Sequence, residues 1–255
     1  MAPNLTSDCA RPTGAAGPKS LVAALICVLA GAGCALDPQI DKPSVKREAP
    51  TGFAAGERVA ILLSSYDKEG VALAGAAAKK GESRQWQRIE ERLESCLKQS
   101  MLGGRGDLSF VSPGEARRTL FPGNAISEFP HDPAEMLQRA GERESRERLA
   151  ALGLRYVVLL EGRWSTNDGK FEGGGFIIGG ALLYGWDRFS RLRATVVDLT
   201  HRRSAGEVVV YGKGDVGGGV LIFLPGIPVP FLAMSDPESE ACAALGKGLA
   251  GFISE

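Results

Sequence analysis

The residues best suited to chemistry are a glycine-rich motif, two histidines and five cysteines. The run Gly212-Lys213-Gly214-Asp215-Val216-Gly217 matches the G-x-G-x-x-G pattern and follows a predicted strand. A dinucleotide site needs a helix N-terminus after this motif to hold the pyrophosphate, whereas more glycines and a proline-interrupted apolar run follow here. No G-K-S/T loop is present either. We therefore expect no bound nucleotide and no cofactor.

The two histidines predict neither a catalytic nor a metal centre. His131 precedes a helix cap, and His201 stands in a turn beside Arg202 and Arg203. Nucleophilic triads and zinc sites bring histidine close to other ligands, and the cysteines are not spaced as a local metal cluster. We expect solvent-exposed histidines, no catalytic residues and no metal ligands.

The N-terminal segment carries the most specific pattern. Residues 1–20 are polar, and the twelve residues Leu21–Ala32 are apolar or small. A helix that spans a bilayer needs ~20 apolar residues, so this run fits the core of a secretory signal. It ends in Gly31-Ala32-Gly33-Cys34, which resembles the lipobox of bacterial lipoproteins, where the cysteine is lipidated and becomes the new N-terminus.

The lipobox resemblance implies that residues 1–33 are a signal peptide and that a lipid on Cys34 anchors the chain in a membrane. Ala35 follows the cysteine, where aspartate is typical of inner-membrane retention, so we expect the outer membrane, facing the periplasm. Lipoboxes favour leucine at the position of Gly31. An ordinary signal, cut nearby and leaving Cys34 unmodified, is the alternative.

Cleavage before Cys34 leaves Cys96 and Cys242 as a pair. Each falls on the apolar stripe of a predicted helix, one in the first helix and the other in the last. If both helices pack on one face of a sheet, the Cα atoms can approach within the ~4.4–6.8 Å that a disulfide needs. An oxidising compartment favours this bond. The alternative is two buried free thiols that act as small apolar residues.

Hydrophobic periodicity predicts a mixed α/β (α+β) fold in one domain, residues 58–255. Helices separate the first three strands, which indicates parallel pairing through right-handed crossovers, and a β-hairpin and a C-terminal helix complete the order β-α-β-α-β-β-β-α. The predicted elements are strands at 59–63, 108–111, 156–160, 192–199 and 207–211, and helices at 83–101, from 113, from 133 (broken near Gly141, ended by Gly153) and from about 236.

Two kinds of segment fall outside these elements. Residues 34–57 contain three prolines and no hydrophobic periodicity, which predicts a flexible tether. Residues 162–189 and 217–234 are glycine-rich and apolar, and we expect them to form loops. In the alternatives left open, the apolar runs within them form core strands, pack as loops on the core, meet a membrane or partner, or form a pore-lining hairpin. Because segments 173–185 and 217–234 flank the same predicted hairpin, we expect them to lie next to each other and to form the functional surface.

The element order and three short phrases carry a second resemblance. The phrases are Leu152-Gly153-Leu154-Arg155-Tyr156-Val157-Val158, Ala194-Thr195-Val196-Val197-Asp198-Leu199 and Glu240-Ala241-Cys242-Ala243-Ala244-Leu245-Gly246. Residues 58–254 are similar to the small α/β domain shared by the periplasmic N-terminal domain of the Tol–Pal translocation protein and the curli-secretion lipoprotein. The resemblance implies an assembly or interaction role in the cell envelope and brings no catalytic residues.

Three functions remain open. The first is a lipid-anchored, non-enzymatic envelope protein that binds other envelope proteins. The second is a subunit of an oligomeric outer-membrane secretion pore, and the third is an envelope hydrolase without a recognisable site. Lysine plus arginine equals aspartate plus glutamate at 30 each, so composition makes no case for nucleic acid as a partner.

Overall fold

The computed structural model describes residues 38–54, 56–68, 71–74, 82–121, 132–167, 170–176, 179–223 and 227–254. Its strands form one 10-stranded sheet whose main path runs β1-β9-β8-β6-β3-β4. The strands are β1 (Gln39–Ile40), β2 (Ser44–Arg47), β3 (Arg58–Lys68), β4 (Val71–Ala74), β5 (Ser109–Val111), β6 (Leu154–Thr166), β7 (Lys170–Phe176), β8 (Gly179–Asp198), β9 (Arg203–Phe223) and β10 (Ile227–Met234). The helices are α2 (Glu82–Gly104), α3 (Pro113–Leu120), α4 (Pro133–Ala140), α5 (Arg143–Leu152) and α6 (Pro237–Ser254).

The sheet is mixed, as the element order predicts. β3 lies between β5 and β6 and pairs with both in parallel, whereas β6, β8 and β9 pair antiparallel. Parallel strands need a long crossover, and α2 and α3–α5 supply it here. The predicted fold class is therefore confirmed.

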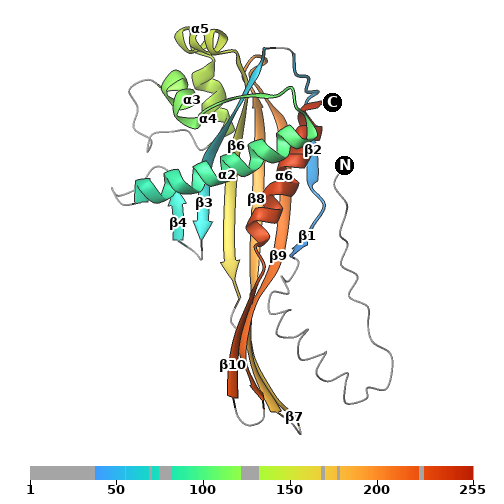
Figure 1. Ribbon diagram of the computed structural model, residues 1–255. Coiled ribbons are helices and arrows are strands. Elements are labelled where there is room, and N and C mark those ends of the chain that lie inside the picture. The colour runs from blue at the N-terminus through green and yellow to red at the C-terminus, as the bar shows by residue number, and fades with distance from the viewer. Residues whose placement is uncertain are drawn as a thin grey trace.

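Helices cover the two faces of the sheet unequally (Figure 1). α2 and α6 lie across one face, where Leu93, Leu97 and Leu245 belong to the larger apolar core. The smaller core on the opposite face gathers residues of α3, α4 and α5 over the upper part of the sheet. On this opposite face, residues further along β6, β8 and β9 are exposed, such as Arg163, Arg191 and Tyr211. This region, which the helices leave uncovered, is called the open face.

The predicted helix ends agree with local chemistry. Ser112 Oγ accepts a hydrogen bond from the Glu115 N–H, and Asp132 Oδ1 accepts one from Ala134. At the start of α6, Asp236 Oδ1 accepts from the Ser239 N–H, so Asp236 rather than Ser235 caps that helix. Each cap satisfies a backbone donor that has no partner within its helix.

Residues 34–57 are not a flexible tether from Pro38 onward, and that prediction is wrong there. β1 and β2 both pair antiparallel with β9, and the N–H groups of Glu48 and Ala49 donate to Ala205 O. Prolines exclude a helix but are tolerated beside an edge strand. The outer edge of β9 has backbone groups that need partners, and this segment supplies them.

The two glycine-rich segments are strands rather than loops, which corrects the second expectation. β6 extends to Thr166, and β7, the first part of β8, the last part of β9 and β10 contain most of the remaining residues. Glycine and proline have low strand propensity, but here each strand has a neighbour that pairs with its backbone. Pro228 and Pro230 lie in β10, which pairs with β9 alone among the described strands. An edge strand is where proline is tolerated.

Gly206→Ala is expected to destabilise the protein by about 1–3 kcal/mol. Gly206 has a φ of +138°, and a Cβ atom there would lie 2.1 Å from the carbonyl oxygen of Lys46, so β2 must move away from β9. Urea unfolding measures the loss. Gly52→Ala is the matched control because its added Cβ meets nothing within 4 Å. Equal stability of the two variants would show that β2 is not held against β9.

Candidate functional site: an open-edged extension of the sheet

A four-stranded part of the sheet projects beyond the helices (Figure 1). It consists of β7, residues 179–186 of β8, residues 216–223 of β9, and β10, in the order β7-β8-β9-β10, and is called the extension below. Gly179 pairs with both Phe176 and Phe223, and Phe223 also pairs with Ile227, so the four strands run side by side. The predicted adjacency of the two glycine-rich segments is confirmed.

Both outer strands of the extension lack a second neighbour among the described residues. β7 pairs with β8 only, and β10 pairs with β9 only. A free edge presents unpaired N–H and C=O groups to another chain, and soluble proteins usually protect such edges with charged residues. The extension contains only two charged residues, Lys170 and Glu172, in its sequence. Pro228 and Pro230 remove two donors from β10, but β7 has no proline.

The N-terminal strand lies close to the root of the extension. Gln39 of β1 pairs with Lys213, which is three residues before the extension begins at Val216. Cys34 lies outside the described residues and stands five positions before Gln39 in the sequence. A chain of that length spans at most ~18 Å.

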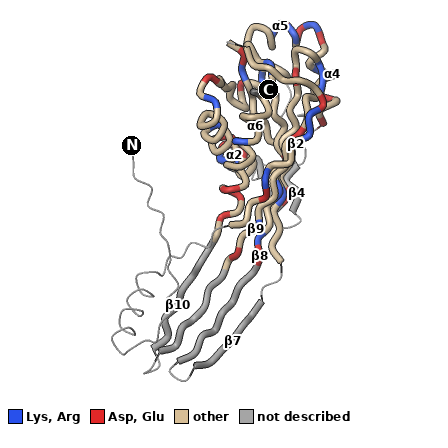
Figure 2. Tube along the Cα trace, turned by 90° about the vertical axis from the view of Figure 1, so that its right-hand side faces the viewer, with Lys and Arg blue, Asp and Glu red and all other residues tan. Residues whose placement is uncertain are grey.

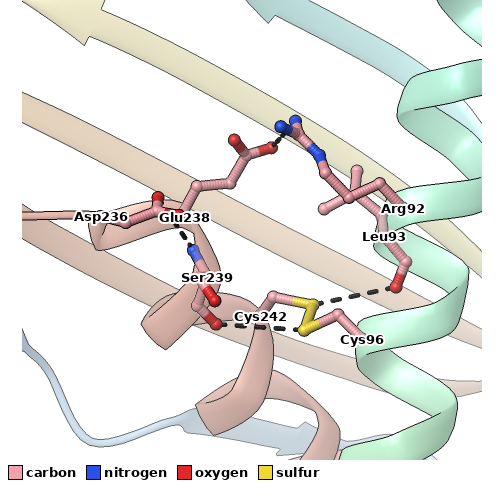
Figure 3. Close-up of a disulfide and its surroundings, with 7 residues drawn as sticks. All are labelled: Arg92, Leu93, Cys96, Asp236, Glu238, Ser239 and Cys242. Atoms are coloured by element: carbon pink, nitrogen blue, oxygen red, sulfur yellow. Dashed lines mark hydrogen bonds and ion pairs between the residues drawn. A yellow bond between two sulfur atoms is a disulfide. The ribbon is translucent and has the colours of Figure 1, made fainter.

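A disulfide joins the two cysteines predicted to pair (Figure 3). Cys96 of α2 and Cys242 of α6 have Cα atoms 6.3 Å apart, and the sulfur of Cys242 lies 3.8 Å from the carbonyl oxygen of Leu93. Cys242 is buried. The bond links the two helices that cover one face of the sheet across 146 residues of sequence.

Ion pairs formed by buried carboxylates tie the helices to each other and to the strands. Arg92 of α2 contacts Glu238 of α6 at 2.7 Å, and the Tyr66 hydroxyl donates to the same carboxylate. Burial, followed by the charge of Glu238, raises the pKa of Tyr66. Glu90 pairs with Arg117 and also accepts the Leu63 N–H. These contacts join elements, and within the described ranges no three His, Cys, Asp or Glu residues gather as a metal site.

The histidines and the glycine-rich motif complete the residues that the sequence singles out. His201 Nδ1 lies 2.8 Å from the buried carboxylate of Asp198, and His131 lies outside the described residues. The G-x-G-x-x-G run lies within β9 with strand on both sides, so no helix follows it in the sequence as a dinucleotide site requires. A Cβ on Gly214 would lie 2.8 Å from Pro237 Cδ, so this glycine permits α6 to start close to the sheet.

Sequence reasoning missed a hollow on the open face of about 380 Å³. Arg163, Phe189, Arg191, Tyr211 and Lys213 contribute side chains to its wall. The sequence signal that could have found it is the alternation in 189–194, which places Phe189, Arg191 and Arg193 on one face of the strand. The structure buries Ser190, Leu192 and Ala194 on the other face. Figure 2 shows acidic and basic residues continuing along β8 and β9 as far as the start of the extension.

Across the described ranges, no helix is both long and apolar enough to cross a bilayer.

Comparison with known proteins leaves the family open. No protein-family model and no curated protein matches the chain. A PelC dodecamer from Paraburkholderia phytofirmans is similar in structure, with 14% identity and a TM-score of 0.31, over 83% of this chain and 99% of that one. A neuraminyllactose-binding hemagglutinin homologue from Helicobacter pylori has 9% identity and a TM-score of 0.28, over 82% and 85%. The protein CT253 from Chlamydia trachomatis has 11% identity and a TM-score of 0.24, over 77% and 98%.

Proposed function

We propose that this chain is a lipid-anchored, non-enzymatic protein of the cell envelope that assembles with other envelope proteins through the extension. The observation that carries the proposal is the extension itself, a nearly uncharged sheet with two open edges. An isolated sheet of this kind is prone to pair with another chain.

Two further observations support export and anchoring. Disulfides persist in oxidising compartments such as the periplasm, and the Cys96–Cys242 bond fits that environment. A lipid on Cys34 would hold the membrane surface within ~18 Å of Gln39, beside the root of the extension. The extension would then lie at the membrane, where lipid or neighbouring proteins can cover its apolar residues.

Shortening the extension tests the proposal. Thr166 pairs with Arg188, and Val216 pairs with Met234, so a two-residue Asn-Gly turn can join each pair and delete the strands beyond them. We expect the shortened protein to unfold at the same urea concentration as the full chain. We also expect it to lose the partners that the full chain retains when both are purified from membranes in mild detergent.

By light scattering, the particles of the mature, detergent-solubilised protein should contain more protein chains with the extension than without it. The same number of chains per particle and the same retained partners in both forms would overturn the proposal. A shortened protein that unfolds earlier would instead show that the extension stabilises the domain, and this outcome also counts against an assembly role.

A subunit of a ring-shaped secretion pore is the second candidate function. The four strands of the extension are paired over seven or eight residues each, which corresponds to ~25 Å at ~3.3 Å per residue, somewhat short of the ~30 Å of a bilayer core. Open edges on β7 and β10 also permit head-to-tail pairing of identical subunits, which closes a ring when the rotation allows it. A large closed oligomer in detergent would favour the pore, and a monomer or dimer with other proteins bound would favour the binding module.

Cys34→Ser is expected to release the protein from membranes or to leave the signal uncut, because the thioether to diacylglycerol forms on sulfur. Membrane fractionation and mass spectrometry of the mature N-terminus measure the outcome. Cys27→Ser, within the apolar run, is the matched control and should be processed normally. The outcome is clearest in the shortened protein, since the extension can hold the chain at a membrane by itself. A shortened Cys34→Ser protein that is cut normally and still fractionates with membranes would contradict lipid anchoring.

A further inference from the structure

We propose that the hollow on the open face binds a sugar acid, a pyranose that carries a carboxylate, through Arg191 and Tyr211. The hollow lies on β6, β8 and β9, on the domain side of the extension. A smaller hollow of about 210 Å³, which Asp67 and Glu161 also line, adjoins it at Arg163 and Arg191. The inference does not rest on the assembly role of the extension.

Two arginines stand at opposed positions of neighbouring strands in the wall of the hollow. Arg163 pairs directly with Arg191 in the β6–β8 register, and both are exposed on the same face. Like charges at opposed positions of neighbouring strands destabilise a sheet. Arg163 lies 3.6 Å from Asp67, whereas Arg191 contacts no carboxylate among the described residues. A bound carboxylate would relieve the repulsion and receive a bidentate pair from a guanidinium.

An aromatic surface adjoins the arginines. Tyr211 is paired with Arg191 in the β8–β9 register, its ring centroid is 5.5 Å from the guanidinium carbon, and 47% of its surface is exposed. Phe189 lines the same hollow under Lys213, whose Nζ lies 5.8 Å from the ring centroid. Exposed rings offer a flat apolar face, and the C–H face of a pyranose fits against such a ring.

The acidic and neutral groups in the hollow favour a sugar acid over an anion of higher charge density. Asp41, Gln39 and Ser165 line it, and Asp187 lies 3.4 Å from Lys213. These oxygens and the amide can bond to sugar hydroxyls. These carboxylates offset part of the positive charge, so the hollow suits a ligand of low charge density better than a phosphate-rich polymer. A ligand with one carboxylate and several hydroxyls on each ring matches this composition.

Titration calorimetry of the mature domain with oligogalacturonate tests the inference. Neutral maltohexaose, monomeric galacturonate, polyglutamate and inorganic phosphate are the comparison probes. We expect saturable binding of oligogalacturonate and of the monomer, with the oligomer tighter because it offers several rings that can occupy the hollow. Losing a charge-assisted hydrogen bond should make Arg191→Gln bind about 10-fold more weakly or worse, and Tyr211→Ala should lose a similar factor.

Arg143→Gln is the matched control, since Arg143 is 89% exposed on α5 and lies outside the hollow. It should bind like the unaltered protein, and all three variants should keep its unfolding midpoint. Equal affinity for polyglutamate together with a silent Tyr211→Ala would show simple charge attraction and overturn the sugar assignment. Absence of saturable binding, tighter binding of phosphate, or an equal loss in Arg143→Gln would overturn it as well.

Discussion

Replacing both Cys96 and Cys242 with alanine should lower the free energy of unfolding by about 4–5 kcal/mol, the largest effect that we expect from any pair of substitutions. The bond closes a loop across 146 residues, and a crosslink over so long a loop removes much of the conformational freedom of the unfolded chain. Alanine suits the site because Cys242 is buried in the apolar core between α2 and α6.

Urea unfolding with and without reductant measures this effect. Reductant should shift the midpoint of the unaltered protein toward that of the double variant, and it should leave the double variant unchanged. This control separates loss of the crosslink from loss of side-chain volume. Reduction breaks the S–S bond and adds a hydrogen to each sulfur, but it removes no side-chain atoms. A midpoint that does not respond to reductant, with the thiols shown to be free, would contradict the prediction.

Glu90→Ala should cost about 3–5 kcal/mol, because it leaves a largely buried arginine without its carboxylate. Glu90 is 5% exposed, and Arg117 Nη1 donates to its Oε2 at 2.7 Å. Glu90 Oε1 also accepts the backbone N–H of Leu63 at 2.9 Å. The carboxylate thus links α2, α3 and β3, and its removal leaves a buried backbone donor unpaired as well.

A double-mutant cycle checks the assignment. Arg117→Ala should cost less than Glu90→Ala, since Glu90 keeps the Leu63 hydrogen bond in the arginine variant. The double variant should cost less than the sum of the single ones, because partners in a buried pair are coupled. Glu144→Ala, which breaks an exposed pair with Arg148 on α5, is the surface control and should cost under about 1 kcal/mol. Strict additivity in the cycle would contradict a buried pair.

The regular elements could be predicted because their signals are local. β3 and the first half of β6 are continuous apolar runs of the kind that fills a strand buried on both faces. Ser112 and Asp132 stand directly before a proline that begins a helix, and each forms its cap bond within three residues. Gly153 ends α5 in the left-handed conformation, with a φ of +67°. Each of these features depends only on residues close in sequence.

The extension and the N-terminal strands could not be predicted in this way. Glycines and prolines argue against strands in 170–186 and 216–234 when each segment is judged alone, and pairing between segments about 40 residues apart overrides that preference. β2 similarly becomes a strand because the outer edge of β9 needs partners more than 150 residues further along the chain. Secondary structure set by distant partners has no local signature.

By itself, the sequence determined the mixed α/β class, the helix ends and the cysteine pair on two apolar stripes, since each follows from local spacing or chemistry. Only the tertiary structure decided that the glycine-rich segments form an open-edged extension and that Arg163, Arg191 and Tyr211 meet across three strands. Strand register sets those neighbours, and register is fixed by the burial of whole faces rather than by any one segment.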